Sequence, residues 1–425
     1  MHPQIDQPYP ARRRDALARR PLALILFTIF LDVLGLGLII PVAPFYARAF
    51  GADALQVGLL FSAFAVMQFL TTPILGALSD RFGRRPILVF SLIGETAGYV
   101  LLAFANSLPL LFIARIITGA TSGNIGAAQA YLADITTPQA RTRTFGLLGA
   151  AFGLGFMFGP ALGGLLSGLD MRAPALAAAG LVALNVVFVA LRLPESLPLD
   201  RRSRLPLRGQ INPIGVISRL LARPTLRIPL VATLLVNLAF AGFQTNFAVY
   251  VGDRFGFGPL DVGTLFLALG LTSIFMQGLV LRRLSARFSD RAILLAGIGV
   301  SAVGYLLIGA VPSAPWLWAA VPVLSAGSAL WRAPLGSLIS KLVGAREQGQ
   351  ASGGSQAMSS LGSIVGPLVA GLAYERVGQA WPYVLAALIM LLTGALVLRS
   401  QPRASDAGFA RRAGSVPSAV AELAG

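Results

Sequence analysis

Four ionisable side chains lie within long apolar runs of the 425-residue sequence: Asp32, Glu95, Arg115 and Arg332. Charged residues in apolar segments are costly and are functional candidates by default. A buried carboxyl group can bind and release a proton, because burial disfavours its ionised form. A guanidinium can hold an anionic group or stack on an aromatic ring. These residue types therefore indicate proton exchange next to a ligand-binding cavity.

The apolar runs that hold these residues are long enough to cross a membrane. The chain is 56% hydrophobic and 12% charged, with a mean hydropathy of +0.75. A soluble protein of this size needs a more charged surface, and about twenty apolar residues span roughly 30 Å of hydrocarbon. We predict an all-α membrane protein with twelve transmembrane helices, at 21–44, 55–79, 86–105, 108–133, 142–167, 173–193, 226–250, 259–281, 291–311, 315–340, 348–374 and 379–398.

The net charge of +17 is distributed asymmetrically over the loops. If the N-terminus is cytoplasmic, most of the 34 Lys and Arg residues lie in inner segments. The outer loops then hold only Arg48, Arg172, Arg254 and Arg376. This positive-inside pattern predicts that both termini are cytoplasmic and that the protein lies in the plasma membrane, the cytoplasmic membrane of a bacterium. The excess charge therefore reflects topology, and we expect no nucleic-acid partner.

Several kinds of chemistry have no residues to support them. The sequence contains no cysteine, and its one histidine is His2 in the polar N-terminal tail. We find no nucleophile–base pair and no cluster of metal ligands in the spans. We therefore expect no enzymatic activity, no metal and no cofactor. The first apolar run is too long for a signal peptide and is interpreted as a retained helix.

A polar stretch divides the chain into two halves with six predicted spans each. We expect an N-terminal tail (1–20), an N-terminal bundle (21–193), a cytoplasmic linker (194–225), a C-terminal bundle (226–398) and a C-terminal tail (399–425). The latter part of the linker, INPIGVISRLLARP, is amphipathic. It fits either a short helix in the membrane interface or a flexible connection.

A glycine–proline pattern recurs in the two halves. GFMFGPALGG in the fifth span matches GSIVGPLVAG in the eleventh. Glycines four residues apart share one helix face and allow a neighbouring helix to approach closely. One copy fits a generic packing face, whereas two matching copies predict pseudo-symmetric halves that rock about a midplane site. The residues of this helix-packing motif are Gly155, Gly159, Pro160, Gly163, Gly362, Gly366 and Pro367.

Helical rise places three of the four charges near the membrane centre. At about 1.5 Å per residue, Asp32, Glu95 and Arg332 lie roughly 13–16 Å from the inner ends of their spans, and Arg115 lies beyond the centre. We expect these groups to meet in one central cavity. Either Glu95 or Asp32 then carries the proton. The alternative is a static ion pair between one of these acids and Arg332 that holds the halves in register.

Other polar side chains in the apolar spans are candidates to line this cavity. Trp331 beside Arg332 is suited to stacking on a planar or cationic ligand. For each of the others, hydrogen bonding between helices is an equally good explanation. The remaining candidates are Asn124, Gln129, Gln244, Asn246, Gln277 and Gln356.

Four segments resemble a known family. GALSDRFGRRP, RIITGATSGNIGAAQAYLAD and GLGFMFGPALGG resemble the signature motifs of the major facilitator superfamily. LDVLGLGLIIPVAP resembles its twelve-helix drug:proton antiporter branch, tetracycline efflux pumps in particular. The similarity is specific over 21–195 and weaker over 226–398. It implies a monomeric secondary active transporter that exports small organic molecules or drugs by proton antiport with alternating access.

The resemblance also implies an inner gate in the loop that follows the second span. The aspartate at the position of Asp80 faces the start of helix 11 in the family, and the arginine at the position of Arg84 pairs with the acid at Asp134. A helix N-terminus attracts a carboxylate, and each such contact at a partly wet surface contributes about 1 kcal/mol. A plain positive-inside loop explains Arg81 and Arg85 equally well. The loop also contains Gly76 and Gly83.

The resemblance supports Asp32 and Arg115, which fall on motif positions, and it includes one departure. Further membrane acids of tetracycline pumps correspond here to Gly98 and Ser301. Glu95 lies on the same helical face as Gly98 and can substitute for the first acid, but nothing replaces the second. This departure argues against tetracycline itself as the substrate.

Two other functions fit the same predicted fold. The first is uptake or facilitated diffusion of a metabolite, with Arg332 binding an anionic group. The second is a membrane receptor that transports nothing. Dependence of accumulation on a proton gradient distinguishes export from uptake, and flux in vesicles distinguishes both from a receptor.

Overall fold

The computed structural model describes residues 11–137, 140–203, 213–344 and 347–399, and within these ranges it contains helices and turns but no strand. The predicted tails therefore lie largely outside the described residues. The N-terminal half contains α1 (Ala11–Ile39), α2 (Ala43–Ala49), α3 (Ala54–Phe82), α4 (Arg84–Ala103), α5 (Leu108–Thr121), α6 (Asn124–Ile135), α7 (Arg141–Ser167) and α8 (Ala173–Arg192). The C-terminal half contains α10 (Pro224–Phe255), α11 (Pro259–Phe275), the π-helical turn η3 (Met276–Val280), α12 (Leu281–Ser285), α13 (Asp290–Ala310), the short turn η4 (Ala314–Trp316), α14 (Leu317–Lys341), α15 (Gln348–Arg376) and α16 (Trp381–Arg399).

The helices follow the predicted spans closely. Eleven helical segments of the described chain are long and apolar enough to cross a membrane. The twelfth predicted span corresponds to α14, which has 25 residues but is less apolar because it carries Arg332, two prolines and several serines. At about 1.5 Å per residue α14 is still longer than the hydrocarbon core is thick. The predicted all-α fold with twelve spanning segments is therefore confirmed.

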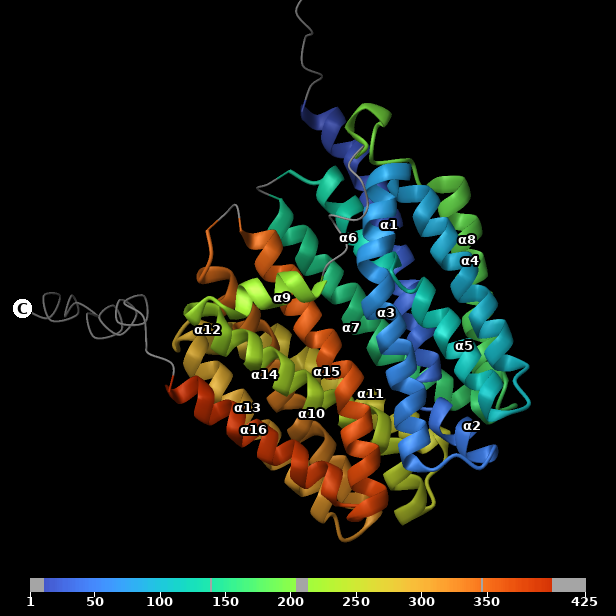
Figure 1. The fold of residues 1–425 in the computed structure, drawn as a ribbon, viewed down its shortest axis with the longest axis vertical. Helices are drawn as coiled ribbons and strands as arrows, with labels where there is room; N and C mark the ends of the chain where they lie inside the picture. Colours follow the sequence, from blue (N-terminus) through green and yellow to red (C-terminus); the bar gives the residue numbers. More distant parts are fainter. Residues whose placement is uncertain (1–10, 138–139, 204–212, 345–346, 400–425) are drawn as a thin grey trace, which may run out of the picture.

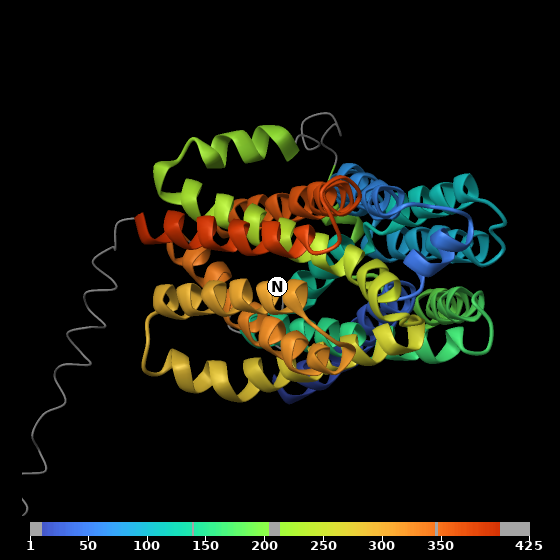
Figure 2. The ribbon, with the colours of Figure 1, turned by 90° about the horizontal axis from the view of Figure 1, so that it is seen from below.

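The helices form two groups that follow the two halves of the sequence. Figure 1 shows the blue-to-green N-terminal helices beside the yellow-to-red C-terminal helices, and the view in Figure 2 shows the same separation from a second direction. Contacts between the groups run mainly through two helix pairs, α3 with α15 and α7 with α11. The interface between the halves is therefore made by the helices that carry the signature loop and the glycine–proline motifs.

The glycine–proline motif makes the same contact in both halves. In α7 a Cβ atom on Gly159 would lie 2.6 Å from the Cα atom of Gly37 in α1. In α15 a Cβ atom on Gly366, the matching position, would lie 3.0 Å from the backbone nitrogen of Gly242 in α10. These separations are below the van der Waals distance, so each position requires glycine. The two halves thus repeat one helix–helix packing arrangement.

The linker contains two short helical segments, η1 (Leu199–Arg201) and α9 (Pro213–Leu221), with residues 204–212 outside the described chain. Ile217 and Leu220 of α9 are buried against α10 and α15. The segment 213–221 of INPIGVISRLLARP is therefore helical, as one of the two interpretations predicted, and its place in the membrane interface stays a prediction. We call the side of the molecule that holds α9 the linker side, and the other the opposite side.

Candidate functional site

Two carboxyl groups meet inside the N-terminal half, at Asp32 of α1 and Glu95 of α4. Their side chains are 7% and 3% exposed. Asn124, the first residue of α6, bridges them, because its Nδ2 donates to Asp32 Oδ1 at 2.6 Å and to Glu95 Oε2 at 3.3 Å. The amide thus holds both acids in one buried cluster, which we call the acid pair. Asn124, which we predicted to line the substrate cavity, is buried here with its amide nitrogen on the two carboxyl groups.

Two further residues surround the acid pair. The hydroxyl of Tyr99 donates to Glu95 Oε1 at 3.1 Å, from one turn along α4. The guanidinium carbon of Arg115 lies 4.4 Å from the ring centroid of Phe64 and 5.1 Å from that of Phe61, both in α3. Arg115 is 1% exposed, and its Nε and Nη1 atoms have no hydrogen-bond partner in the described part of the chain. Aromatic faces therefore hold this buried cation close to the acid pair.

A break in the fourth span places Asn124 next to the acids. Helix α5 ends at Thr121, and α6 begins at Asn124 after Ser122 and Gly123. A Cβ atom on Gly123 would lie 2.5 Å from Leu75 of α3, so the break packs tightly against that helix. An unbroken helix with 3.6 residues per turn would present Asn124 in a different direction. Periodicity in the apolar sequence did not reveal this break.

The two positions where tetracycline pumps carry further acids are tightly packed here. A Cβ atom on Gly98 would lie 3.1 Å from the backbone nitrogen of Thr118. Ser301 is fully buried, and a Cβ atom on Gly327 would lie 2.5 Å from its Oγ. Neither position has room for a carboxylate side chain. The departure noted in the sequence is therefore built into the helix packing.

In the C-terminal half, the side chain of Arg332 is exposed although it lies in the middle of α14. Its guanidinium carbon lies 4.6 Å from the ring centroid of Phe240 and 5.3 Å from that of Trp331. Within the described residues no ion pair joins Arg332 to Asp32 or Glu95. The static pair considered above is thus absent from this conformation. The guanidinium of Arg332 is therefore exposed at mid-helix and has no acidic partner among the described residues.

The other cavity candidates divide by their exposure. Gln129, Gln277 and Gln356 are exposed, Gln244 is half-buried, and Asn246 is buried. Gln277 lies in η3 and donates to Ser273 Oγ at 2.7 Å. Both side-chain polar atoms of Asn246 lack a partner within the described chain. The structure therefore leaves three of these five side chains accessible.

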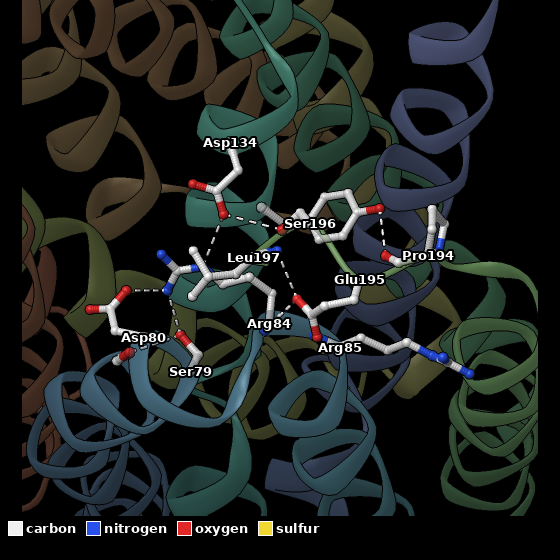
Figure 3. Close-up of polar contacts among 11 residues, drawn as sticks. Ser79, Asp80, Arg84, Arg85, Asp134, Pro194, Glu195, Ser196 and Leu197 are labelled. Atoms are coloured by element: carbon white, nitrogen blue, oxygen red, sulfur yellow. Dashed lines mark hydrogen bonds and ion pairs between the residues drawn. The ribbon is translucent and has the colours of Figure 1, made fainter. Parts of the chain in front are cut away.

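On the linker side, Arg84 is the centre of a polar cluster (Figure 3). Its Nη1 lies 2.5 Å from Asp80 Oδ1, and its Nε lies 3.1 Å from Asp134 Oδ2 at the end of α6. The Arg84–Asp134 pair implied by the family resemblance is present. We call Asp80, Arg84, Asp134 and Glu195 the Arg84 cluster.

Asp80 lies differently from the family expectation in this conformation. Its carboxylate pairs with Arg84 in the same half, and its backbone oxygen accepts from the backbone N–H of Ser203. The start of α15 has another partner, since Glu347 pairs with Arg223 at 3.0 Å. The guanidinium of Arg223 lowers the pKa of Glu347 through this hydrogen bond and its charge. The expected contact between Asp80 and the start of helix 11 is therefore not made, because the halves are apart on this side.

The remaining residues of the loop are placed as follows. Arg81 is exposed, and Arg85 donates to the backbone oxygen of Ala190 in α8. Gly76 has open space around it. Gly83 has φ of +109°, which favours glycine, and a Cβ atom there would lie 2.5 Å from Glu195 Oε2. The glycine therefore allows the linker to approach the start of α4.

Glu195, at the start of the linker, is a member of the Arg84 cluster that sequence reasoning missed. Its Oε1 accepts from the backbone nitrogen of Arg84 at 2.9 Å, and its Oε2 accepts from that of Arg85 at 3.2 Å. The carboxylate thus caps the N-terminus of α4, where negative charge is favourable. The one available signal for this role was an acidic residue in the segment PES, directly after an apolar span.

We expect Glu195→Ala to lower the free energy of unfolding by about 2 kcal/mol, because it leaves the first N–H groups of α4 without their acceptor. Thermal unfolding in detergent measures this change. Asp200→Ala, an exposed acid in the same linker, is the matched control and should leave the midpoint unchanged. Equal midpoints for both variants would contradict the capping role.

On the opposite side, a second set of polar contacts joins the two halves. Arg48 Nη2 lies 2.7 Å from Asp253 Oδ2, which also accepts from the hydroxyl of Tyr374 at 2.7 Å. The backbone N–H of Ala54, the first residue of α3, donates to Glu375 Oε1 of α15 at 2.7 Å. The contact between Glu375 and Ala54 places a carboxylate of one half at a helix N-terminus of the other half. The family resemblance led us to expect such a contact from Asp80 on the linker side, but the structure has it on the opposite side.

Glycines show which side of the interface is closed. On the opposite side, Cβ atoms would meet the backbone of the other half within 3 Å, as at Gly58 against Pro367 and at Gly164 against Pro259. On the linker side, Gly76, Gly149 and Gly353 have nothing within 4 Å of such an atom. The halves therefore pack tightly on the opposite side and are separated on the linker side.

We expect Asp253→Asn to weaken closure of the opposite side, because the neutral amide loses the ion pair with Arg48. An exposed pair of this kind contributes about 1 kcal/mol, which corresponds to a change of about fivefold in the ratio of the two conformations. Because the chain has no cysteine, the labelling rate of a single Ser352→Cys, exposed near the start of α15, reports opening of the linker side without background. If the variant with both Asp253→Asn and Ser352→Cys is labelled at the same rate as Ser352→Cys alone, the Arg48–Asp253 pair does not hold the opposite side closed.

Comparison with known proteins agrees with this architecture. The family model described as Major Facilitator Superfamily matches residues 25–353 and 278–423. The chain is 36% identical to the tetracycline resistance protein, class C, of Escherichia coli, over 85% of this chain and 91% of that protein. It is 26% identical to multidrug resistance protein 2 of Bacillus subtilis, over 90% and 96%. Among solved structures, the human organic anion transporter MFSD10 (TETRAN) matches with a TM-score of 0.70 and 27% identity, over 89% of this chain and 99% of that one.

Proposed function

The chain belongs to the Major Facilitator Superfamily, and from this premise we propose that it exports small organic molecules in exchange for protons. Relatives with resistance functions over nearly the full length support export. The observation that carries the proton-coupled part is the acid pair, Asp32 and Glu95, bridged by Asn124. A buried pair of carboxyl groups exchanges a proton with water only when the cavity next to it is open.

We propose that the acid pair alternates between two states. When it faces the outside, a proton binds one carboxylate oxygen and forms an O–H group. When the linker side opens, the proton leaves to water on that side, and the ionised pair favours substrate binding in the cavity. Two carboxylates this close cannot easily both be ionised, which favours proton uptake as the substrate departs. Each proton that enters thus accompanies one substrate leaving.

The substrate binds in the cavity between the halves in this proposal. Arg332 offers an exposed guanidinium held against the ring of Phe240 in the C-terminal half, whereas Trp331, the predicted stacking residue, is only 3% exposed. Gln129, Gln277 and Gln356 supply accessible hydrogen-bonding groups. Such a lining suits a planar, partly apolar organic molecule. One chain supplies the whole site, so we propose that the transporter works as a monomer.

We propose that the linker side is cytoplasmic and that both termini lie on that side of a bacterial cytoplasmic membrane. The arginine-rich loops, including the linker and the segment 282–291, support this orientation through the positive-inside rule. The conformation described above is then the inward-facing one, ready to take up substrate from the cytoplasm. The domain division into a tail, two bundles, a linker and a second tail follows the same topology.

Accumulation of a panel of fluorescent organic compounds in an efflux-deficient bacterial host tests the proposal. Cells that express the chain should accumulate less of at least one compound, and a proton ionophore should abolish the difference. Greater accumulation in expressing cells would instead support uptake of a metabolite, for which the exposed guanidinium of Arg332 offers an anion site. No effect on any compound in the panel, together with no flux in vesicles, would contradict transport.

A further inference from the structure

We propose that α6 connects the acid pair to the Arg84 cluster, with Asn124 as the positioning residue that reports protonation. This inference rests on the proposed proton-coupled function and adds the element that links proton binding to opening of the linker side. Helix α6 is short, with its first residue at the acid pair and its last turn at the Arg84 cluster. Helix α4 also supplies a residue to each cluster, but it begins at Arg84 and runs without a break past Glu95.

The two ends of α6 make the polar contacts that this connection needs. Asn124 donates to Asp32 and Glu95 as described above, and it is 4% exposed. Ten residues later, Asp134 Oδ2 accepts from Arg84 Nε and from Ser196 Oγ, both at 3.1 Å. At about 1.5 Å per residue, the two contacts are about 15 Å apart. The helix therefore reaches from the centre of the membrane to the linker side.

The break before α6 allows it to move separately from α5. Asn124 follows Ser122 and Gly123, which belong to neither helix, so α6 is not a direct continuation of α5. Arg115, which lies in α5, can stay between its two phenylalanine rings while α6 shifts. Breaks of this kind within membrane helices are found where a helix must move or bind an ion. The fourth span is thus two rods joined at the depth of the acid pair.

Protonation changes what Asn124 can bind. With both acids ionised, its two amide hydrogens each find a carboxylate acceptor, and the positive N-terminus of α6 faces negative charge. A protonated carboxyl instead offers an O–H donor. The Oδ1 atom of Asn124 is buried and has no partner among the described residues, so it is available to accept this hydrogen. Proton binding therefore rearranges the hydrogen bonds at the first residue of α6.

The other groups that face this point hold their place in both states. Tyr99 of α4 donates to Glu95, and Arg115 of α5 is packed against Phe61 and Phe64. Tyr99 lies within the unbroken helix α4, and Arg115 lies within α5, before that helix ends. Asn124 is thus the one bridging group in the described cluster that begins a separate helix. A shift of α6 changes the position of Asp134 and therefore its ion pair with Arg84.

The experiment measures how pH changes the labelling rate of a single Ser352→Cys in reconstituted protein, between about pH 5 and about pH 8. Each rate is divided by the rate of the same reagent with free cysteine at that pH, because ionisation of the thiol alone changes the raw rate. In the parent, we expect the rate to change with pH by about fivefold or more. Asn124→Ala should remove this response, and Asn124→Gln should restore part of it. Asn185→Ala is the matched control, because Asn185 is a fully buried amide in the same half that donates to the backbone oxygen of Thr28.

Asp134→Asn tests the other end of α6 and keeps the inference testable if Asn124→Ala does not fold. We expect this variant to lose the pH response as well, although the acid pair is untouched. A responsive parent together with responsive Asn124→Ala or Asp134→Asn protein would overturn the role of α6 and leave the proposed function standing. A parent that does not respond to pH would overturn proton coupling of the conformations and this inference with it.

Discussion

Replacing Glu95 by Gln is expected to abolish proton-driven transport while leaving substrate exchange intact. Gln keeps the shape of the protonated acid, and its one carbonyl oxygen can still accept from Tyr99, but it cannot release a proton. In proteoliposomes with an imposed pH gradient, active accumulation of a compound identified in the cell assay should fall to that of empty vesicles. Exchange of labelled for unlabelled compound, which needs no net proton movement, should continue.

Asp170→Asn is the control for this prediction, because Asp170 is an exposed acid in the loop between α7 and α8, far along the chain from both acids. It should retain gradient-driven accumulation. Asp32→Asn should behave as Glu95→Gln does if the two carboxyls act as a pair. Full coupling in Glu95→Gln protein would remove this residue as a proton carrier and leave Asp32 to carry it alone.

Replacing Gly58 by Leu is expected to prevent closure of the opposite side. Gly58 of α3 lies against the backbone of Pro367 in α15, where a Cβ atom would lie 3.0 Å from the carbonyl carbon. A larger side chain cannot enter without separating the halves, because backbone atoms do not move aside as a side chain can. The conformation described here should therefore become rare, and transport should stop. Labelling of Ser352→Cys should fall by at least about tenfold.

The same substitution on a lipid-facing helix is the control. Gly180 of α8 is exposed, and a Cβ atom there would have nothing within 4 Å, so Gly180→Leu should leave both labelling and transport unchanged. If Gly58→Leu protein labels at the parental rate, then the halves do not separate at this point, and the closed interface seen here is not part of the transport cycle.

The sequence predicted the spans well because each one has a simple physical signal. Runs of about twenty apolar residues must be helical in hydrocarbon, where every backbone polar group needs an internal partner. Even α14, less apolar than the others, was recognised from its length and position. The repeated packing motif was also readable, because only glycine permits the close backbone approach seen at Gly159 and Gly366.

The acid pair was predicted only in part. The depth of Asp32 and Glu95 along their helices followed from helical rise. The rise does not give the direction in which each side chain points around its helix. Asn124 contacts both acids because of the break at Ser122–Gly123. Small residues are common throughout this segment, so these two gave no recognisable signal of a break. Arg332 was expected near the acids, yet it is exposed in the other half and forms no ion pair with either acid among the described residues. Distances between helices depend on the conformation, and the sequence encodes more than one.

The polar contacts between segments distant in the chain were the least predictable. Glu195 and Asp253 are single acids in loops or at helix ends, and their partners lie far away in the sequence. Their spacing therefore contains no local signal. Asp80 illustrates the same point, because the expected partner belongs to the other half and the halves are apart on the linker side.

Accumulation of a transported fluorescent compound by everted membrane vesicles with an acidified interior tests proton-coupled export directly. Vesicles containing the chain should accumulate the compound, a proton ionophore should release it, and addition of the compound should make the interior less acidic. Accumulation that persists after the proton gradient has collapsed, or a compound that enters without moving protons, would contradict proton-coupled export.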